Sequence, residues 1–196
     1  MDIKGSRTSE NLLKAFAGES QARNRYAYAA KVARKQGYIQ IANIFMETAE
    51  NERMHAKTYL RHLINNGMKG EPITISASYP AALDEEDTVA NLEWAAAGEK
   101  EEWTLLYPEF AEIAEEEGFS DIATTFRMIA KVENKHEIRF RKLIDNIKNQ
   151  RVFKRDGKVF WKCLECGYIH EGETPPTICP SCKHPKEYFE IWCENY

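Results

Sequence analysis

The sequence predicts a mainly α-helical protein, with a bundle of four helices followed by a small β domain that binds a metal. Three observations support this prediction. Apolar residues recur at helical spacing along four long segments of residues 1–150. The pattern Glu-x-x-His occurs twice in those segments, and each copy follows a lone glutamate. Residues 151–196 contain all five cysteines, four of them in two Cys-x-x-Cys pairs.

The four predicted helices cover about residues 9–36, 38–66, 88–117 and 120–148. Gly37 separates the first two, and Pro108 is expected to kink the third. The segment between the second and third helices, residues 67–87, contains two glycines and two prolines and predicts a long crossover loop. Two long hairpins joined by one long crossover are the ferritin-like arrangement.

The two predicted hairpins repeat one another. Matched residues lie 80 or 81 positions apart: Glu19 with Glu99, Gly37 with Gly118, Glu52 with Glu133, and His55 with His136. A nearly constant offset over half of the chain indicates duplicated helix pairs. We therefore expect a pseudo-two-fold axis, with two metal ions placed symmetrically between the hairpins.

The doubled pattern predicts a dimetal site. Positions i and i+3 share a helix face, so each Glu-x-x-His directs one oxygen and one nitrogen at the same point. Two such pairs, with one more glutamate from each of two other helices, form a carboxylate-bridged dimetal site inside a bundle. The expected ligands are Glu19, Glu52, His55, Glu99, Glu133 and His136. Oxygen ligands with one imidazole per metal favour iron or manganese.

The alternative is that these glutamates lie on solvated helix faces. Small residues surround Glu19 and Glu99, and they favour close helix packing, where an uncompensated carboxylate is costly. Glu102 adds a fifth carboxylate on the face of Glu99, whereas the first half has Ala22 there. We expect Glu102 to be a ligand that attaches or detaches as the metal charge changes.

Two tyrosines, Tyr26 and Tyr107, are either core aromatics or hydrogen-bond donors to the ligand carboxylates. His170 and His184 are expected to be loop residues beside the cysteines rather than ligands.

The cysteine pairs predict a second metal site. Its four ligands are Cys163, Cys166, Cys179 and Cys182. Four thiolates at this spacing form a tetrahedral site for zinc or iron, and the spacing by itself favours structural zinc. Cys193 has no partner in the pattern and is expected to be a free thiol.

Composition excludes several classes of protein. The chain is 30% charged and 43% hydrophobic, which is typical of folded domains rather than disordered chains. The net charge is −4, and no basic stripe indicates a partner nucleic acid. No run reaches the ~18 apolar residues of a membrane span, and the N-terminus lacks a signal peptide. We therefore expect a cytoplasmic protein without membrane contact.

At this point the sequence resembles the rubrerythrin family over nearly its whole length. The resemblance is carried by GESQARNRY (18–26), LYPEF (106–110), the two Glu-x-x-His motifs, KCLECGYIHEG (162–172) and CPSCKHP (179–185). It implies a ferritin-like diiron bundle in residues 1–150 and a rubredoxin-like domain in residues 151–196. It also implies iron at the four cysteines, with zinc as a substitute in recombinant material.

The resemblance further implies a role for each site residue. Glu52 and Glu133 bridge the irons, Glu19 and His55 bind one iron, Glu99 and His136 bind the other, Glu102 exchanges with His55, and Tyr26 and Tyr107 support the ligands. The catalytic residues would be Glu102, His55, Tyr26 and Tyr107.

The implied activity is a peroxidase that reduces hydrogen peroxide to water in oxidative-stress defence. Electrons would come from a rubredoxin or an NAD(P)H-dependent reductase, and the working unit would be a homodimer or larger homo-oligomer. Two alternatives belong to other classes. One is a ferritin-like iron oxidase or store, and the other is a binding module whose zinc ribbon holds a partner.

Overall fold

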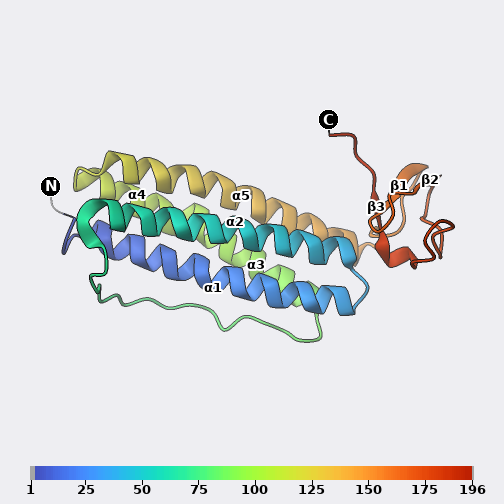
Figure 1. Ribbon diagram of the computed structural model, residues 1–196, viewed down its shortest axis with the longest axis horizontal. Helices are drawn as coiled ribbons and strands as arrows, with labels where there is room; N and C mark the ends of the chain where they lie inside the picture. Colours follow the sequence, from blue (N-terminus) through green and yellow to red (C-terminus); the bar gives the residue numbers. More distant parts are fainter. Residues whose placement is uncertain (1–2, 196) are drawn as a thin grey trace.

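The computed structural model of the protein describes residues 3–195. The bundle consists of α1 (Arg7–Lys35), α2 (Ile39–Leu63), α3 (Thr88–Glu101), α4 (Tyr107–Glu116) and α5 (Ser120–Lys148), with two short π-helices, η1 (Ile64–Met68) and η2 (Glu102–Leu106). The C-terminal module contains β1 (Val159–Cys163), β2 (Ile169–Gly172), the 3-10 helix η3 (Lys186–Tyr188) and β3 (Phe189–Ile191). This confirms the predicted ferritin-like bundle with a small β region (Figure 1).

The crossover between the hairpins has no regular secondary structure over residues 71–84. It runs along the outside of the bundle beside α1 (Figure 1). The hydroxyl of Tyr79 donates to the backbone carbonyl of Lys14 at 2.7 Å, which fastens the loop to α1. The loop ends at Asp87, whose carboxylate accepts from two backbone N–H groups and caps α3.

The turns inside the two hairpins are the same. Gly37 and Gly118 both have φ of +82°, a left-handed conformation that favours glycine. In each turn the residue after the glycine donates its N–H to the carbonyl five positions back, at 2.8 Å. This Schellman motif satisfies a carbonyl at the end of the first helix and starts the second. It supports the predicted duplication.

The hairpins also cap each other's first helices. The carboxylate of Glu117 accepts from the backbone N–H and hydroxyl of Thr8 at 2.8 and 2.6 Å. The amide oxygen of Gln36 accepts from the same two groups of Thr88 at 3.1 and 2.6 Å. Both contacts join matched positions, so the pseudo-two-fold relation holds at the ends of the bundle.

The second half contains one extra residue, and η2 accommodates it. The offset between the halves rises from 80 at Glu99 to 81 at Tyr107. Between them, the N–H of Tyr107 donates to the carbonyl of Glu102, which is a π-type bond that spans one more residue than an α-helical bond. The break expected at Pro108 therefore begins at Glu102, and Pro108 lies in the first turn of α4.

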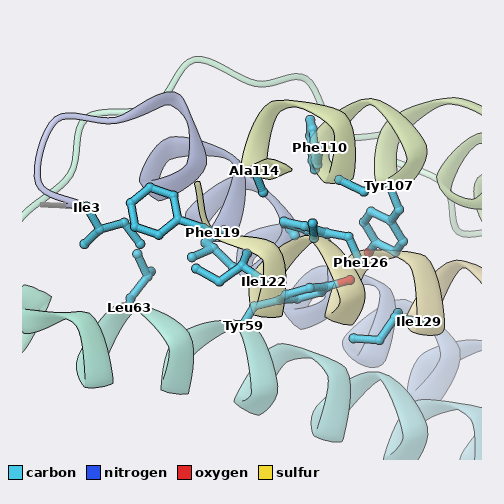
Figure 2. Close-up of a cluster of buried hydrophobic side chains, with 14 of the residues drawn as sticks. Ile3, Tyr59, Leu63, Tyr107, Phe110, Ala114, Phe119, Ile122, Phe126 and Ile129 are labelled. Carbon is cyan, nitrogen blue, oxygen red and sulfur yellow. The ribbon is translucent and has the colours of Figure 1, made fainter. Parts of the chain in front are cut away.

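Two apolar clusters fill the bundle, one on each side of its middle. One is built around Tyr59, Tyr107 and Phe126, and the other around Tyr26 and Phe140. Figure 2 shows the first of these. The residues of the predicted dimetal site lie between the two clusters along α1, α2 and α5. None of the helices within residues 3–195 is long and apolar enough to cross a membrane.

The module at the C-terminus is a three-stranded antiparallel sheet in the order β2-β1-β3. Its core consists of Trp161, Cys163, Cys179 and Phe189. The module lies beyond the end of α5, near the turn between α1 and α2 (Figure 1). The boundary at residues 150 and 151 stays a prediction.

Candidate metal centres

The bundle brings six predicted ligands together from α1, α2, α3 and α5. They form two groups, Glu19 with Glu52, His55 and Glu133, and Glu52 with Glu99, Glu133 and His136. Within each group the ligand atoms lie within 4.8 Å of one another. Glu52 and Glu133 belong to both groups. All four carboxylates are at most 1% exposed.

The two histidines face the carboxylates in the same way. The Nδ1 atom of His55 lies 2.9 Å from Oε2 of Glu52 and 2.9 Å from Oε1 of Glu133. The Nδ1 atom of His136 lies 2.8 Å from Oε2 of Glu133 and 3.2 Å from Oε1 of Glu52. The helical spacing predicted that each imidazole would share a face with the glutamate of its own motif. In the structure each imidazole also contacts the glutamate of the other motif, in the other hairpin.

The unpaired atoms at this site fit a pair of metal ions. Within residues 3–195, several buried ligand atoms lack a hydrogen-bond partner: Oε2 of Glu19, Oε1 of Glu52, Oε2 of Glu99, both carboxylate oxygens of Glu133, and Nδ1 of His136. Buried acceptors without partners are costly, and bound cations compensate them. Oxygen ligands with one imidazole per ion suit iron or manganese.

The pKa values show how strongly the carboxylates repel one another. Burial and the charges of Glu133 and Glu52 hold the pKa of Glu19 and of Glu99 well above the usual value. For Glu52, burial opposes ionisation, but the neighbouring imidazoles of His136 and His55 lower its pKa to about 2. Without metal the site must therefore hold protons, which bound cations displace.

Each predicted tyrosine supports the lone glutamate of the other hairpin. Tyr26 donates its hydroxyl to Oε1 of Glu99 at 2.6 Å, and Tyr107 donates to Oε1 of Glu19 at 2.5 Å. Both rings are buried. The sequence left open whether these residues were core aromatics or hydrogen-bond donors, and in the structure they are both.

Glu102 is not in either ligand group of the structure. It is half-buried in η2 and lines a pocket of about 290 Å³ between α1, η2, α4 and the crossover. Gly18 forms part of the wall, and a Cβ there would lie 4.0 Å from Oε1 of Glu102 and 3.6 Å from the ring of Tyr79. Burial and the nearby charge of Glu19 raise the pKa of Glu102. The carboxylate thus lies near the charge of Glu19, in a pocket that opens between α1 and the crossover.

The four cysteines of the second predicted site also meet. The sulfur atoms of Cys163 and Cys182 are 3.7 Å apart, as are those of Cys166 and Cys179. Tetrahedral ligands at a metal–sulfur distance of about 2.3 Å would be about 3.8 Å apart. The spacing of the thiols therefore fits one tetrahedral metal ion.

The two Cys-x-x-Cys loops are related by an offset of 16 residues. Gly167 donates its N–H to the carbonyl of Cys163 at 2.9 Å, and Lys183 donates to that of Cys179 at 3.0 Å. The φ angle is +78° at Gly167 and +66° at Lys183, so a lysine adopts the left-handed conformation that glycine adopts in the first loop. Nothing in the sequence around Lys183 predicted this left-handed conformation.

The flanking histidines differ in part from expectation. His170 lies in strand β2 rather than in a loop, because it pairs with Trp161 of β1. His184 is outside the strands, and its Nδ1 lies 3.3 Å from the sulfur of Cys182. Cys193 is exposed and forms no disulfide among residues 3–195, and its role as a free thiol stays a prediction.

Comparison with protein families agrees with both centres. A family model described as rubrerythrin matches residues 10–144, and one described as the rubrerythrin rubredoxin-like domain matches residues 161–190. The chain belongs to the rubrerythrin family. It is therefore an oxidoreductase of the diiron type, with a carboxylate and histidine diiron site in the bundle and a four-cysteine rubredoxin-like site.

Similar proteins match nearly the whole chain. It is 56% identical over 195 residues to Rubrerythrin-1 of Clostridium acetobutylicum, covering 99% of this chain and 98% of that protein. It is 50% identical over 194 residues to the rubrerythrin of Nitratidesulfovibrio vulgaris, covering 99% and 98%.

Solved structures agree with the fold. The partially reduced state of nigerythrin matches with a TM-score of 0.63 and 34% identity, covering 96% of this chain and 87% of that one. A Desulfovibrio desulfuricans bacterioferritin matches with a TM-score of 0.65 at 23% identity, covering 74% and 82%, and supports the bundle fold alone.

Proposed function

We propose that the protein is a peroxidase that reduces hydrogen peroxide to water. The observation that carries the proposal is the pocket beside the dimetal ligands, on a chain that also contains a four-cysteine centre. A diiron pair supplies two electrons, the number that one peroxide needs. The remaining requirements are access for a small uncharged molecule and two protons, and the residues around the pocket can provide both.

Glu102 and Tyr107 line the pocket between the surface and the ligands. Because the pKa of Glu102 is raised by burial and by Glu19, this carboxyl can hold a proton close to the ligands. Peroxide donates and accepts hydrogen bonds, so a carboxyl group and a phenol suit it as partners. We assign Glu102 as the group that binds peroxide and moves its protons, and as the ligand that exchanges with His55.

We assign to the metal ligands the roles that the resemblance to the rubrerythrin family implies. Glu52 and Glu133 would serve both irons, which their membership of both ligand groups supports. Glu19 and His55 would bind one iron, and Glu99 and His136 would bind the other. Tyr26 and Tyr107 donate to one oxygen of each lone glutamate, which leaves the other oxygen available to hold a metal ion.

Electrons would reach the diiron site through the four-cysteine iron, which receives them from a rubredoxin or an NAD(P)H-dependent reductase. His136 and Lys148 are separated by about 18 Å along α5, at 1.5 Å per residue. The module of the same chain therefore lies far from its own diiron site. A second copy packed head to tail would bring its module closer, so we propose a homodimer as the smallest working unit in the cytoplasm.

The activity is tested by anaerobic stopped-flow mixing of fully reduced protein with hydrogen peroxide, and separately with dioxygen. The proposal requires oxidation by peroxide to be the faster reaction. A faster reaction with dioxygen, with little response to peroxide, would instead support the alternative of a ferritin-like iron oxidase.

The path of the electrons is tested with two inactive variants. Cys163→Ser removes one ligand of the four-cysteine site, and Glu52→Ala removes a bridging carboxylate. We expect neither to turn over alone, although reduced Cys163→Ser should still react once with peroxide. Activity recovered in the mixed dimer would show transfer between subunits. No recovery in confirmed heterodimers would mean that electrons travel within one chain.

A further inference from the structure

Two positions near the diiron site break the match between the hairpins. Glu102 is the counterpart of Ala22, 80 residues on. Phe140 of α5 is the counterpart of Tyr59 of α2, 81 residues on. The polar members of the two pairs, Glu102 and Tyr59, both lie on the Tyr107 side of the dimetal site. The ring of Tyr59 is 5.7 Å from that of Tyr107, whereas the ring of Phe140 is 5.4 Å from that of Tyr26.

Packing does not explain the hydroxyl of Tyr59. The residue is 0% exposed, and its Oη has no hydrogen-bond partner among residues 3–195. A buried polar group without a partner destabilises a protein by about 1–3 kcal/mol. Phe140 fills the matching position with 0% exposure and no such cost. The ring would therefore suffice for the core, where Tyr59 stacks on Phe126 at 5.0 Å.

The number of phenols follows the number of carboxylates on each side. Beside Tyr26 there is one lone carboxylate, Glu99, and Tyr26 donates to it. On the other side there are two, Glu19 and Glu102, but the one hydroxyl of Tyr107 donates only to Glu19. A phenol has a single O–H, so Tyr107 cannot serve both carboxylates fully at once.

Tyr59 is placed to supply the second donor. Figure 2 shows its hydroxyl directed toward that of Tyr107 in the core. Tyr107 in turn lines the pocket that holds Glu102. Burial and the charges of Glu19, Glu133 and Glu102 raise the pKa of Tyr59 well above its usual value, whereas the nearby hydroxyl of Tyr107 lowers it. The hydroxyl of Tyr59 therefore stays protonated beside that of Tyr107, although the two form no hydrogen bond of ordinary geometry here.

We propose that Tyr59 is a positioning residue for Glu102. The hydroxyl of Tyr59 donates a hydrogen bond to Tyr107 in one redox state of the diiron site and releases it in the other. This rests on the proposed movement of Glu102. When Glu102 approaches the metal site, the hydroxyl of Tyr107 is shared between two carboxylates, and donation from Tyr59 holds its oxygen in place. When Glu102 lies in its pocket, as here, Tyr59 is left without a partner.

The test is redox-difference infrared spectroscopy of the iron-loaded protein, with ring-labelled tyrosine to identify the phenol bands. Oxidation and reduction are driven electrochemically without peroxide, so the result does not depend on peroxidase activity. We expect a band pair in the wild type that disappears in Tyr59→Phe and persists in Tyr28→Phe, a control at a half-exposed tyrosine of α1. The same pair should disappear in Glu102→Ala, although Tyr59 is still present.

A difference spectrum of Tyr59→Phe identical to the wild type would overturn the proposal, as would a Tyr59 band that persists in Glu102→Ala. Stability separates this role from a structural one. Since Tyr59 has no partner here, Tyr59→Phe should melt at the same or a higher temperature, and a clear decrease would indicate a permanent hydrogen bond and contradict the proposal. Turnover should fall about fivefold, the effect of one ordinary hydrogen bond, and should not fall further when Glu102→Ala is already present.

Discussion

The two helical hairpins share their turns, caps and metal ligands, and they differ where the second hairpin contains one more residue. Gly37 and Gly118 form the same turn, and each hairpin caps the first helix of the other. The extra residue produces η2, whose first residue is Glu102. The repeated part of the structure contains the six ligands of the dimetal site, and we propose that the unrepeated part serves the reaction.

Metal removal should have the largest effect on the repeated part, and it should reverse the pH dependence of stability. In the metal-free protein, burial raises the folded pKa of Glu19 and Glu99, and contacts with Glu133 and Glu52 raise that of His136 to about 12. Groups with raised folded pKa values stabilise the folded state at low pH and lose this contribution as pH rises.

Across pH 5 to 9 the metal-free protein should therefore become less stable, by up to about 1.4 kcal/mol per pH unit for each proton released. The metal-loaded protein should become more stable, because its ligands bind metal without protons. Glu52, with a folded pKa of about 2, is ionised throughout this range and adds no slope. Thermal unfolding of both forms at several pH values measures the two slopes, and slopes of the same sign would contradict this reasoning.

Removing the unrepeated carboxylate should affect turnover but not binding. Glu102→Ala should leave the bundle folded with both irons bound, because the six repeated ligands are intact. Peroxide turnover should fall on the order of 100-fold, the usual contribution of a group that transfers protons. Glu109→Ala changes an exposed carboxylate of α4 that does not line the pocket, and it is the matched control. Equal turnover in the two variants would mean that the unrepeated part is structural.

The two matched caps should differ in how much they stabilise the protein, because Glu117 is charged and Gln36 is neutral. Glu117→Ala should destabilise the protein by about 2 kcal/mol and Gln36→Ala by about 1 kcal/mol, since hydrogen bonds to a carboxylate are roughly twice as strong. Despite partial burial, hydrogen bonds from Thr8 and Arg7 lower the folded pKa of Glu117. Its contribution is therefore present above about pH 4.5 and lost as pH falls through the folded pKa. Chemical unfolding at pH 7 and pH 3 should show the difference between the variants shrinking at low pH.

The matched turns should give the smallest difference. Gly37→Ala and Gly118→Ala each force alanine into a left-handed conformation, at a cost of about 1–2 kcal/mol. A Cβ at Gly37 would also lie 2.8 Å from Cγ of Glu187 in η3, whereas nothing lies within 4 Å at Gly118. Hydrogen exchange of the C-terminal module should increase in Gly37→Ala alone. An equal response in both variants would show that this contact does not hold the module.

Much of the fold follows from the sequence because its signals are local and repeated. The helical spacing, the glycine turns and the constant offset placed all four long segments to within a few residues. The six dimetal ligands follow from the same geometry, since Glu-x-x-His fixes one face of a helix. The four cysteines likewise determine their own site by their spacing.

The features that the sequence did not reveal depend on contacts between distant segments. The π-helix at Glu102 resembles an ordinary helix in its residue pattern, and only the change of offset from 80 to 81 marks it. Tyr59 is indistinguishable from a core aromatic until it is compared with Phe140, the residue at the matching position of the second hairpin. The caps by Glu117 and Gln36 join residues far apart in the chain. Lys183 has a left-handed conformation although it is not a glycine, so its residue type does not predict that conformation.

The segment between Lys148 of α5 and Val159 of β1 connects the two metal centres covalently. A short tether of this kind keeps its two ends at an effective concentration in the mM range, whatever the concentration of the protein. Each bundle is therefore made together with one cysteine module, because translation produces the two at a ratio of one to one. Neither changes in gene expression nor dilution during growth can separate the two.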